Sequence, residues 1–259
     1  MLLAIKIGNT NVGFGICDDN AQWLGVWRAQ TRADATADEY AALLDEFFAS
    51  APSDFSPRTL SGAILVSVVP PLTQTLAQMC EQHLGLTALI VKADCRFGMK
   101  ILYDNPRAIG MDRVVPCVAA KAKYGAPTLV IDFGTATTFN VINRDGNYAG
   151  GAIAPGLNMT ADALHLFTAK LPRVAVGRPP EKIIATNTND ALRAGVFFGY
   201  VSLVEGMIRR VLDEMREPNT NVIATGGLAN ILAPHLPAIR AVDQELTYEG
   251  LRIIYEMNK

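Results

Sequence analysis

The sequence contains few of the residues that build metal clusters or disulfide frameworks. Its four cysteines, Cys17, Cys80, Cys95 and Cys117, are widely separated and form no Cys-x-x-Cys pair. Its three histidines also lack the spacing that is typical of metal ligands. We therefore predict reduced cysteines, as in a cytosolic protein, and structural or surface histidines.

Strong charge of one sign and long apolar runs are also missing. The net charge is −2, and the lysines and arginines are scattered rather than gathered in a stripe, which excludes nucleic acid as an expected partner. The first residues are apolar for only five positions before Lys6, too short for a signal peptide or a membrane span, and no later window reaches membrane length without a charge or a turn signal. We expect a cytoplasmic protein with no membrane partner.

What the chain does contain is enough apolar sequence for a substantial core. Half of its 259 residues are apolar and 19% are charged, an ordinary balance for a globular protein. This length suits one large domain or two of modest size.

The first half of the chain predicts an α/β domain that begins with a β-hairpin. Two short apolar strands, Leu2–Ile7 and Val12–Cys17, flank the turn Gly8-Asn9-Thr10-Asn11. Thr36 and Glu39 form a candidate capping box at the start of the first helix. The further predicted elements are a strand at 23–30, a helix at 34–50, a strand at 63–69, a helix at 72–84, a strand at 88–91 and a helix at 110–124.

The second half begins with the same pattern. A strand at Thr128–Asp132 leads through the tight turn Phe133-Gly134-Thr135-Ala136 into another strand. The predicted elements that follow are strands at 138–143 and 148–153, helices at 161–171 and 190–215, a strand at 222–225 and a closing helix at 249–257, with a long loop at 172–189.

The two hairpins indicate an internal duplication. Ile5–Thr10 and Ile131–Ala136 share the order strand, glycine turn, hydroxyl residue and second strand, and they lie 126 residues apart. We predict two α/β domains, residues 1–125 and 126–259, that face each other across a cleft, with the last helix as a candidate to pack back on the first domain.

Three glycine turns are candidates to hold a nucleotide. A glycine at the tip of a turn lets backbone N–H groups approach a phosphate, and a neighbouring Asn or Thr adds donors. Gly8-Asn9-Thr10 and Gly134-Thr135 are of this kind, and Thr225-Gly226-Gly227 ends an apolar strand and enters a helix. Taken alone, each hairpin turn is more typical of a structural turn, and the third fits an ordinary strand-to-helix turn equally well. Two copies at the repeat spacing, with the third, favour nucleotide binding.

Together the three turns resemble the layout of the actin-like ATPase and sugar-kinase superfamily. Within it, the chain is similar to type III pantothenate kinases along nearly its whole length. The motifs that carry this resemblance are Gly8-Asn9-Thr10-Asn11, Thr31-Arg32, Asp38-Glu39-Tyr40, Ser67-Val68-Val69-Pro70, Gly110-Met111-Asp112-Arg113, residues 132–138, residues 150–156, Asn187-Thr188 and Thr225-Gly226-Gly227-Leu228. The resemblance implies duplicated ribonuclease H-like domains with mixed five-stranded sheets.

It also implies an activity. The family transfers the γ-phosphoryl group of ATP to pantothenate, giving 4′-phosphopantothenate in the first step of coenzyme A biosynthesis. By resemblance, Asp112 is the base that accepts the hydroxyl proton. A carboxylate next to Arg113 suits this chemistry, because the guanidinium can hold an anionic group. From the residues alone, an ion pair at a helix start explains the same dipeptide.

The remaining roles implied by resemblance fall into three groups. Tyr103, Gly110, Met111, Arg113 and Thr188 match the pocket for pantothenate. Asp132 matches the ligand of a monovalent cation, K⁺ or NH₄⁺. The positions that match ATP contacts are Lys6, Gly8, Asn9, Thr10, Asn11, Gly13, Thr135, Gly226 and Gly227. The family is dimeric, with an acceptor pocket built partly at the subunit interface, so the resemblance implies a homodimer.

Two positions depart from the family. Lys6 stands where the family has an aspartate that helps to hold Mg²⁺ on the ATP phosphates, and a lysine ammonium has no lone pair for a metal. Three consequences remain open: Lys6 abolishes metal binding, contacts a phosphate directly, or pairs with Asp132 in place of the monovalent cation. Ala185-Thr186 replaces the usual Gly-Lys before Asn187, so pantothenate is a less secure expectation than the fold.

Three functions therefore compete. The first is an active pantothenate kinase. The second is a catalytically impaired family member with a nucleotide-binding, regulatory or accessory role. The third is a kinase that acts on another hydroxyl compound, such as a sugar or a nucleoside.

Overall fold

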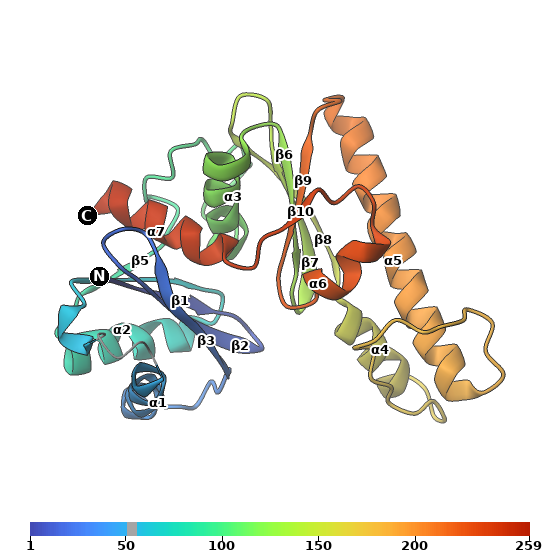
Figure 1. The fold of residues 1–259 in the computed structure, drawn as a ribbon, viewed down its shortest axis with the longest axis horizontal. Helices are drawn as coiled ribbons and strands as arrows, with labels where there is room; N and C mark the ends of the chain where they lie inside the picture. The colour runs from blue at the N-terminus through green and yellow to red at the C-terminus, as the bar shows by residue number, and fades with distance from the viewer. Residues whose placement is uncertain (51–55) are drawn as a thin grey trace. The chain divides into compact units, whose positions relative to one another are not determined.

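The chain forms two compact units. The computed structural model describes residues 1–50 and 56–259. Unit 1 comprises Met1–Ala119 together with Leu246–Lys259, and unit 2 comprises Ala120–Glu245. Each unit contains a five-stranded mixed sheet with helices packed on it (Figure 1).

The sheet of unit 1 is built around its first strand. Its strands are β1 (Leu2–Ile7), β2 (Asn11–Cys17), β3 (Trp23–Gln30), β4 (Gly62–Ser67) and β5 (Ala88–Ile90), in the order β3-β2-β1-β4-β5. β1 pairs antiparallel with β2 and parallel with β4. The predicted hairpin and third strand are therefore present.

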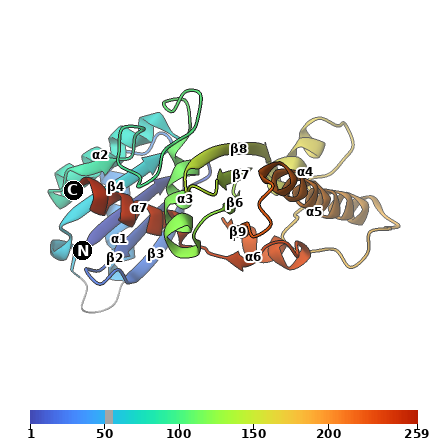
Figure 2. The same cartoon turned by 90° about the horizontal axis from the view of Figure 1, so that it is seen from above.

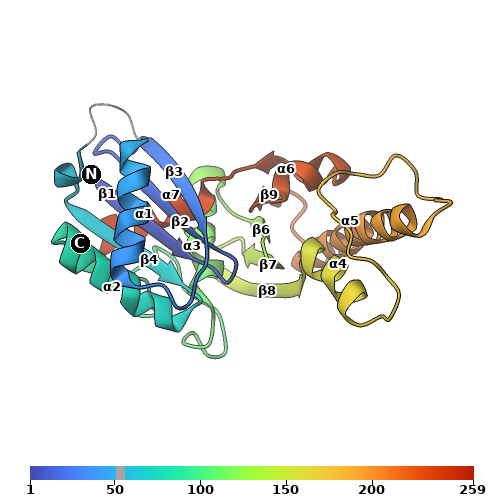
Figure 3. The same cartoon turned by 90° about the horizontal axis from the view of Figure 1, so that it is seen from below.

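Helices cover both faces of this sheet. They are α1 (Ala37–Ala49), α2 (Pro70–Leu84), α3 (Met111–Tyr124), which continues into unit 2, and α7 (Leu246–Asn258), with a 3-10 turn at Pro57–Thr59. Figure 2 shows α7 in front of the strands of unit 1, and Figure 3 shows α1 in front of them from the opposite side. Leu44 of α1 and Leu76 of α2 pack with Ile5 and Phe14 in one buried cluster. The sheet is thus a layer between helices.

Local sequence signals explain where these helices begin and end. The Thr36–Glu39 capping box is present, with the Thr36 hydroxyl accepting from the Glu39 N–H and the Glu39 carboxylate accepting from the Thr36 N–H. Pro70 and Pro71 occupy the first turn of α2, where proline costs no hydrogen bond. α2 ends at Gly85 in the left-handed conformation, which places two capping bonds on its last carbonyls.

Unit 2 repeats the sheet. Its strands are β6 (Thr128–Phe133), β7 (Ala136–Ile142), β8 (Tyr148–Pro155), β9 (Asn221–Thr225) and β10 (Ala241–Val242), in the order β10-β9-β6-β7-β8. β6 pairs antiparallel with β7 and parallel with β9, as β1 pairs with β2 and β4. Lys6 of β1 and Asp132 of β6 hold the same place in their strands. The predicted duplicated α/β fold is confirmed.

The helices of unit 2 are α4 (Leu157–Leu166), α5 (Thr188–Met215) and the short α6 (Ala229–Leu232), with a 3-10 turn at Ala233–His235. Phe197, Tyr200 and Val204 of α5 pack with Phe133 and Phe139 of the sheet. The predicted helix at 161–171 was wrong at both ends. α4 begins four residues earlier, at Leu157 directly after Gly156, and ends at Leu166.

α5 is long and apolar. Over 18 residues its mean hydropathy is 1.4, so among the described residues it meets a length and composition criterion for crossing a membrane. A core helix meets the same criterion, and side chains of α5 do line the core of unit 2. This is weak evidence, and the absence of a membrane partner stays a prediction.

Three of the four cysteines are buried and unreactive. Burial raises the pKa of the Cys17 thiol to about 11 and that of Cys80 to about 12, and it also raises the pKa of Cys117. Since the thiolate is the reactive form, these side chains behave as small apolar groups at neutral pH. Cys95 is only half-buried.

The contact of α7 with α3 requires a residue without a side chain at Gly250. A Cβ added at Gly250 would overlap the backbone carbonyl of Val115. Gly250→Ala is expected to lower the free energy of unfolding by about 1–3 kcal/mol, because the helices must move apart. Urea unfolding followed by circular dichroism measures this change.

Gly195→Ala is the matched control. Gly195 lies inside α5, where an added Cβ meets nothing within 4 Å. The control is expected to gain up to about 1 kcal/mol from helix propensity. Equal stabilities of the two variants would contradict the close packing of α7 on α3.

Candidate active site

The turn between β1 and β2 is a fixed loop with an exposed tip. The Gly8 N–H donates to the Asn11 carbonyl at 3.0 Å, which closes the turn. Thr31 holds it from the side: its hydroxyl donates to the Gly8 carbonyl at 2.6 Å and its N–H to the Thr10 carbonyl at 2.9 Å. Asn9 and Thr10 are exposed. The backbone is therefore held in place while polar groups at the tip remain open to a ligand.

Gly13 lies on β2 directly opposite Lys6. A Cβ at Gly13 would overlap the hydroxyl group of Tyr248, the third residue of α7. Tyr248 is buried, and burial raises its pKa to about 12, so it is neutral at physiological pH. Only glycine at position 13 allows α7 to approach the hairpin this closely.

Lys6 occupies the end of β1 and is half-buried. Its Nζ lies 3.4 Å from Oγ1 of Thr247 on α7. An ammonium group offers donors and no metal ligand, so the residues at the end of β1 do not fit Mg²⁺. Within residues 1–50 and 56–259, no cluster of three His, Cys, Asp or Glu side chains could hold a metal either.

Asp112 lies in the first turn of α3, and this turn lies near Val68, the residue that follows β4. The Arg113 N–H donates to the Gly110 carbonyl at 3.0 Å, and a Cβ at Gly110 would overlap the Asp112 carboxylate. The nearest atom beyond this turn is on Val68, whose N–H donates to the Ile7 carbonyl at 3.0 Å. Unit 1 thus brings the Asp112 turn near Val68, whose backbone is hydrogen-bonded to the last residue of β1.

The other residues of unit 1 that are predicted to bind pantothenate lie within or shortly before this turn in the sequence. Arg113 is 7% exposed and Met111 is equally buried, so both side chains lie inside the unit. Tyr103 is 37% exposed, in the segment without helix or strand that leads to α3.

In unit 2, Asp132 lies between two glycine turns. Gly226 has φ +94°, and a Cβ there would overlap the Asp132 carboxylate and the backbone of Phe133. On the other side, a Cβ at Gly134 would come within 3.6 Å of the same carboxylate. Glycine is therefore required at Gly226 by conformation and by space, and Asp132, Gly134 and Gly226 form one group.

Gly156 packs against the same group of residues. A Cβ at Gly156 would overlap the carbonyls of Gly134 and Thr135, so the start of α4 packs directly on the β6–β7 turn. Thr135 and Gly227 remain exposed. Next along the chain, Thr137 shares a short hydrogen bond with the buried Tyr200, which ties the turn to α5.

Thr188 lies apart from this group. It is the first residue of α5, which Asn187 caps by accepting from the Asp190 N–H at 3.0 Å. In Figures 1 and 2 this end of α5 extends away from the sheet of unit 2. Unit 2 therefore does not bring Thr188 to Asp132, Thr135 or Gly226.

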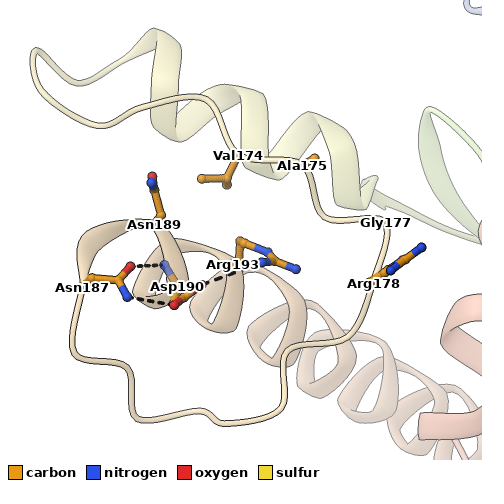
Figure 4. Close-up of a pocket in the computed structure, with 8 residues that line it drawn as sticks. All are labelled: Val174, Ala175, Gly177, Arg178, Asn187, Asn189, Asp190 and Arg193. Atoms are coloured by element: carbon orange, nitrogen blue, oxygen red, sulfur yellow. Dashed lines mark hydrogen bonds and ion pairs between the residues drawn. The ribbon is translucent and has the colours of Figure 1, made fainter.

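A surface pocket of about 770 Å³ adjoins Thr188 (Figure 4). Segment 174–178 forms one side and the first turns of α5 form the other. Two cationic side chains, Arg178 and Arg193, line it with Asn187, Asn189 and Asp190, and Arg193 lies 3.7 Å from the Asp190 carboxylate. The pocket thus combines apolar lining from segment 174–177 with charged and amide side chains whose charges are partly balanced.

Several residues that shape these turns had no signal in the sequence. Thr247 and Tyr248 touch Lys6 and Gly13 from a distant part of the chain, and the Gln244 side chain donates to the Gly226 carbonyl at 3.1 Å. Gly156 belongs to a quoted motif, but only the packing shows what it does. Contacts across such separations follow from the tertiary fold and not from local patterns.

The duplicated five-stranded sheets and their paired glycine turns define a class by fold: proteins built from two actin-like domains. A glucokinase of the ROK family from Streptomyces griseus, solved in complex with glucose and AMPPNP, is similar in fold with a TM-score of 0.54. It is 12% identical in sequence, and the alignment covers 99% of this chain and 98% of that one. At this identity the likeness shows the fold alone.

Sequence relatives define the family. The family model for type III pantothenate kinase matches residues 2–210. The type III pantothenate kinase of Pelobacter propionicus is 47% identical, and that of Citrifermentans bemidjiense 45%, each over 259 residues and the full length of both chains. The chain belongs to the type III pantothenate kinase family, as the resemblance implied.

The packing at Gly226 generates a prediction for nucleotide binding. Gly226→Ala forces a side chain onto Asp132 and strains a left-handed residue, so the turn must move. We expect at least about a tenfold loss of ATP affinity by titration calorimetry, equivalent to roughly 1.4 kcal/mol.

The control variant Gly85→Ala separates the effect of backbone strain at a positive φ from the effect of displacing a neighbouring residue. Gly85 also has a positive φ, but an added Cβ there meets nothing within 4 Å. This control is expected to lose about 1 kcal/mol of stability and to keep its ATP affinity. Unchanged ATP binding by Gly226→Ala would show that the turn does not contact nucleotide.

Proposed function

We propose that this protein phosphorylates pantothenate with ATP, producing 4′-phosphopantothenate and ADP in the first step of coenzyme A biosynthesis. The observation that carries the proposal is the position of Asp112, in the first turn of α3, a turn that lies near Val68 at the end of β4. Full-length relatives named type III pantothenate kinase support the acceptor.

The glycine turns are our candidates for the ATP site. In unit 1 these are the exposed tip Asn9-Thr10 and the preceding Gly8, held by Thr31. In unit 2 they are Thr135 and Gly226-Gly227, which flank Asp132. Backbone N–H groups and hydroxyls of such turns bind phosphate oxygens without a net charge of their own.

Asp112 is assigned as the general base. Its carboxylate accepts the proton of the pantothenate hydroxyl as the oxygen attacks the γ-phosphorus, and the bond from that phosphorus to the β,γ-bridging oxygen breaks with its electron pair leaving on ADP. Gly110 keeps space for the carboxylate, and the closed turn fixes its direction. Tyr103, Met111 and Arg113 are proposed to shape the acceptor side.

Lys6 and Asp132 have different proposed roles toward charge in the site. Because Lys6 does not fit a magnesium site, we assign its ammonium the role of a positive charge for a phosphate oxygen, beside the Gly8 turn. Asp132 offers carboxylate oxygens, which suit a monovalent cation such as K⁺, and it lies against the glycine turns at Gly134 and Gly226.

We further propose a cytoplasmic homodimer in which a second copy completes the acceptor pocket with Thr188. Large apolar side chains are exposed on unit 2: Ile153, Met159, Leu164, Leu166, Phe167, Ile183, Ile184 and Leu203. The side chain of Phe167 is 86% exposed and that of Ile184 is 85% exposed. Together these residues expose more apolar surface than single scattered residues would. They lie on β8, on and just after α4, in the loop before α5, and on α5 itself, a distribution that suits an interface.

The base assignment is tested with Asp112→Asn. The amide keeps the shape but cannot accept the proton, so pantothenate-dependent ADP release in a coupled assay should fall by at least about 100-fold. Asp45→Asn, an exposed carboxylate on α1, is the control and should retain full activity. An Asp112→Asn variant with normal turnover would exclude Asp112 as the base.

Lys6 is tested by Lys6→Ala and Lys6→Asp in the same assay with Mg²⁺ and K⁺. If the ammonium contacts a phosphate, Lys6→Ala should raise the KM for ATP by about tenfold, the usual size for loss of a charge-assisted hydrogen bond. Activity that appears only in Lys6→Asp would instead favour the catalytically impaired alternative.

The homodimer is tested by Phe167→Glu. A charge buried in an apolar interface should convert the protein to a monomer in sedimentation velocity at micromolar concentration. Gln82→Glu, on the exposed face of α2, is the control and should leave the mass unchanged. A wild-type protein that sediments as a monomer would end this proposal.

A further inference from the structure

A side chain from the segment after β10 holds the Gly226 turn of unit 2. Gln244 is half-buried, and its Nε2 donates to the Gly226 carbonyl at 3.1 Å. Because a carbonyl oxygen only accepts hydrogen bonds, the carboxamide must present its nitrogen here and not its oxygen. The same carbonyl accepts from the Ala229 N–H at 3.1 Å. One donor within the turn and one from outside it therefore fix the Gly226 carbonyl.

The rest of the turn packs against the end of β6. A Cβ at Gly226 would overlap the Asp132 carboxylate and the backbone of Phe133. The Leu228 N–H lies 3.4 Å from the Phe133 carbonyl, to which it donates. The turn is thus held by contacts from β6 and by Gln244 from beyond β10.

Fixing the Gly226 carbonyl also fixes the next N–H group. A trans peptide unit is planar, so the carbonyl of Gly226 and the N–H of Gly227 point in opposite directions. With the carbonyl bonded to Gln244, the Gly227 N–H points away from Gln244. Gly227 is exposed. The turn therefore offers a backbone donor of fixed direction, the kind of group that binds anionic oxygens in such turns.

Gln244 is itself held in place by its neighbour Asp243. Asp243 is 8% exposed, and its Oδ2 accepts from Lys123 Nζ at 2.6 Å and from the Tyr124 hydroxyl at 2.9 Å. Its N–H donates to the Ala224 carbonyl at 2.8 Å. The hydrogen bond to Asp243 raises the pKa of Lys123, which therefore stays charged at neutral pH. The backbone before Gln244 is thus tied to the end of α3 and to β9.

We propose that Gln244 is a positioning residue for nucleotide binding, whose carboxamide holds the Gly226 carbonyl so that the Gly227 N–H is directed at an oxygen of ATP. All of the contacts that carry this inference lie within unit 2. The inference rests on the proposed nucleotide site at the Gly226 turn. Gln244 acts through the turn and not on the nucleotide itself.

The test compares Gln244→Met with a matched control, Asn221→Leu. Methionine keeps the unbranched shape of the side chain at position 244 but removes its donor. Asn221 begins β9 at the end opposite Gly226, and its Nδ2 donates to the Tyr124 carbonyl at 2.9 Å. Asn221 also accepts from Arg240 Nη1 at 2.8 Å, so the control loses at least as many hydrogen bonds of unit 2. Urea unfolding measures the stability of both variants.

The first measurement needs no nucleotide. Amide hydrogen exchange of the full chain is compared for wild type and the two variants. Gln244→Met should raise exchange about fivefold in peptides covering 225–229, the change expected for the loss of one net hydrogen bond. Asn221→Leu should leave these peptides unchanged. Unchanged exchange in Gln244→Met would show that the turn does not depend on Gln244 and would overturn the inference.

The second measurement is ATP affinity by calorimetry with Mg²⁺ and K⁺ and without pantothenate. Gln244→Met should weaken binding about fivefold, equivalent to about 1 kcal/mol, and Asn221→Leu should bind as wild type does. In the coupled assay, Gln244→Met should raise the KM for ATP by the same factor and leave kcat and the KM for pantothenate unchanged. That split is the signature of a lost contribution to nucleotide binding, because general loss of structure would change all three parameters.

The remaining outcomes separate this inference from the proposed function. Normal ATP affinity in Gln244→Met, together with impaired binding in Gly226→Ala, would leave the nucleotide site in place and overturn the role of Gln244. Equal losses of affinity in Gln244→Met and Asn221→Leu would reduce that role to general stability and would also overturn it. A wild-type protein that binds no ATP would end the proposed function, and the role of Gln244 with it.

Discussion

Both sheets depend on one constraint: a central strand that is antiparallel to its hairpin partner and parallel to the strand on its other side. This arrangement brings the turn after β1 and the end of β4 to the same edge in unit 1, and the turn after β6 and the end of β9 to the same edge in unit 2. Glycines then allow the backbones to meet there. Gly226 on Asp132 and Gly110 on Asp112 are contacts that any larger residue would push apart. The strand topology thus determines where the candidate site lies in each unit, and the side chains then determine its chemistry.

Much of this arrangement could be predicted from local patterns. The Gly8 and Gly134 hairpins, the Thr36 capping box and the Pro70 helix start are signals within a few residues, and the repeat at 126 residues gives the duplication. The limits are equally physical. β10 has two residues, too few for any periodicity, and α4 begins after Gly156 because of packing on the β6–β7 turn. The contacts of Gln244, Thr247 and Tyr248 depend on where the chain returns, which no local pattern encodes.

Because the sheet is duplicated, Lys6 can be compared with the residue at the equivalent position of the second sheet, Asp132. Lys6 and Asp132 hold equivalent places in equivalent strands, each paired with a hairpin residue on one side and a parallel strand on the other. The family has carboxylates at both positions, and this chain has a cation at one. Exchanging an anion for a cation alters the local charge by two units in a half-buried setting, where screening by water is weak. The first strand of this chain therefore ends in a cationic side chain, which offers hydrogen-bond donors and no metal ligand.

The return of α7 to unit 1 has a consequence for how the protein is made. The final residues, Leu246–Asn258, cover β1 and β4, so unit 1 is discontinuous in sequence while unit 2 is continuous. During synthesis from the amino end, the sheet that emerges first lacks this covering helix until Leu246–Asn258 have been made. Unit 2 has all of its segments earlier and can complete its core sooner. Unit 1, although its sheet is translated first, can therefore complete its core only after all of unit 2 has been made.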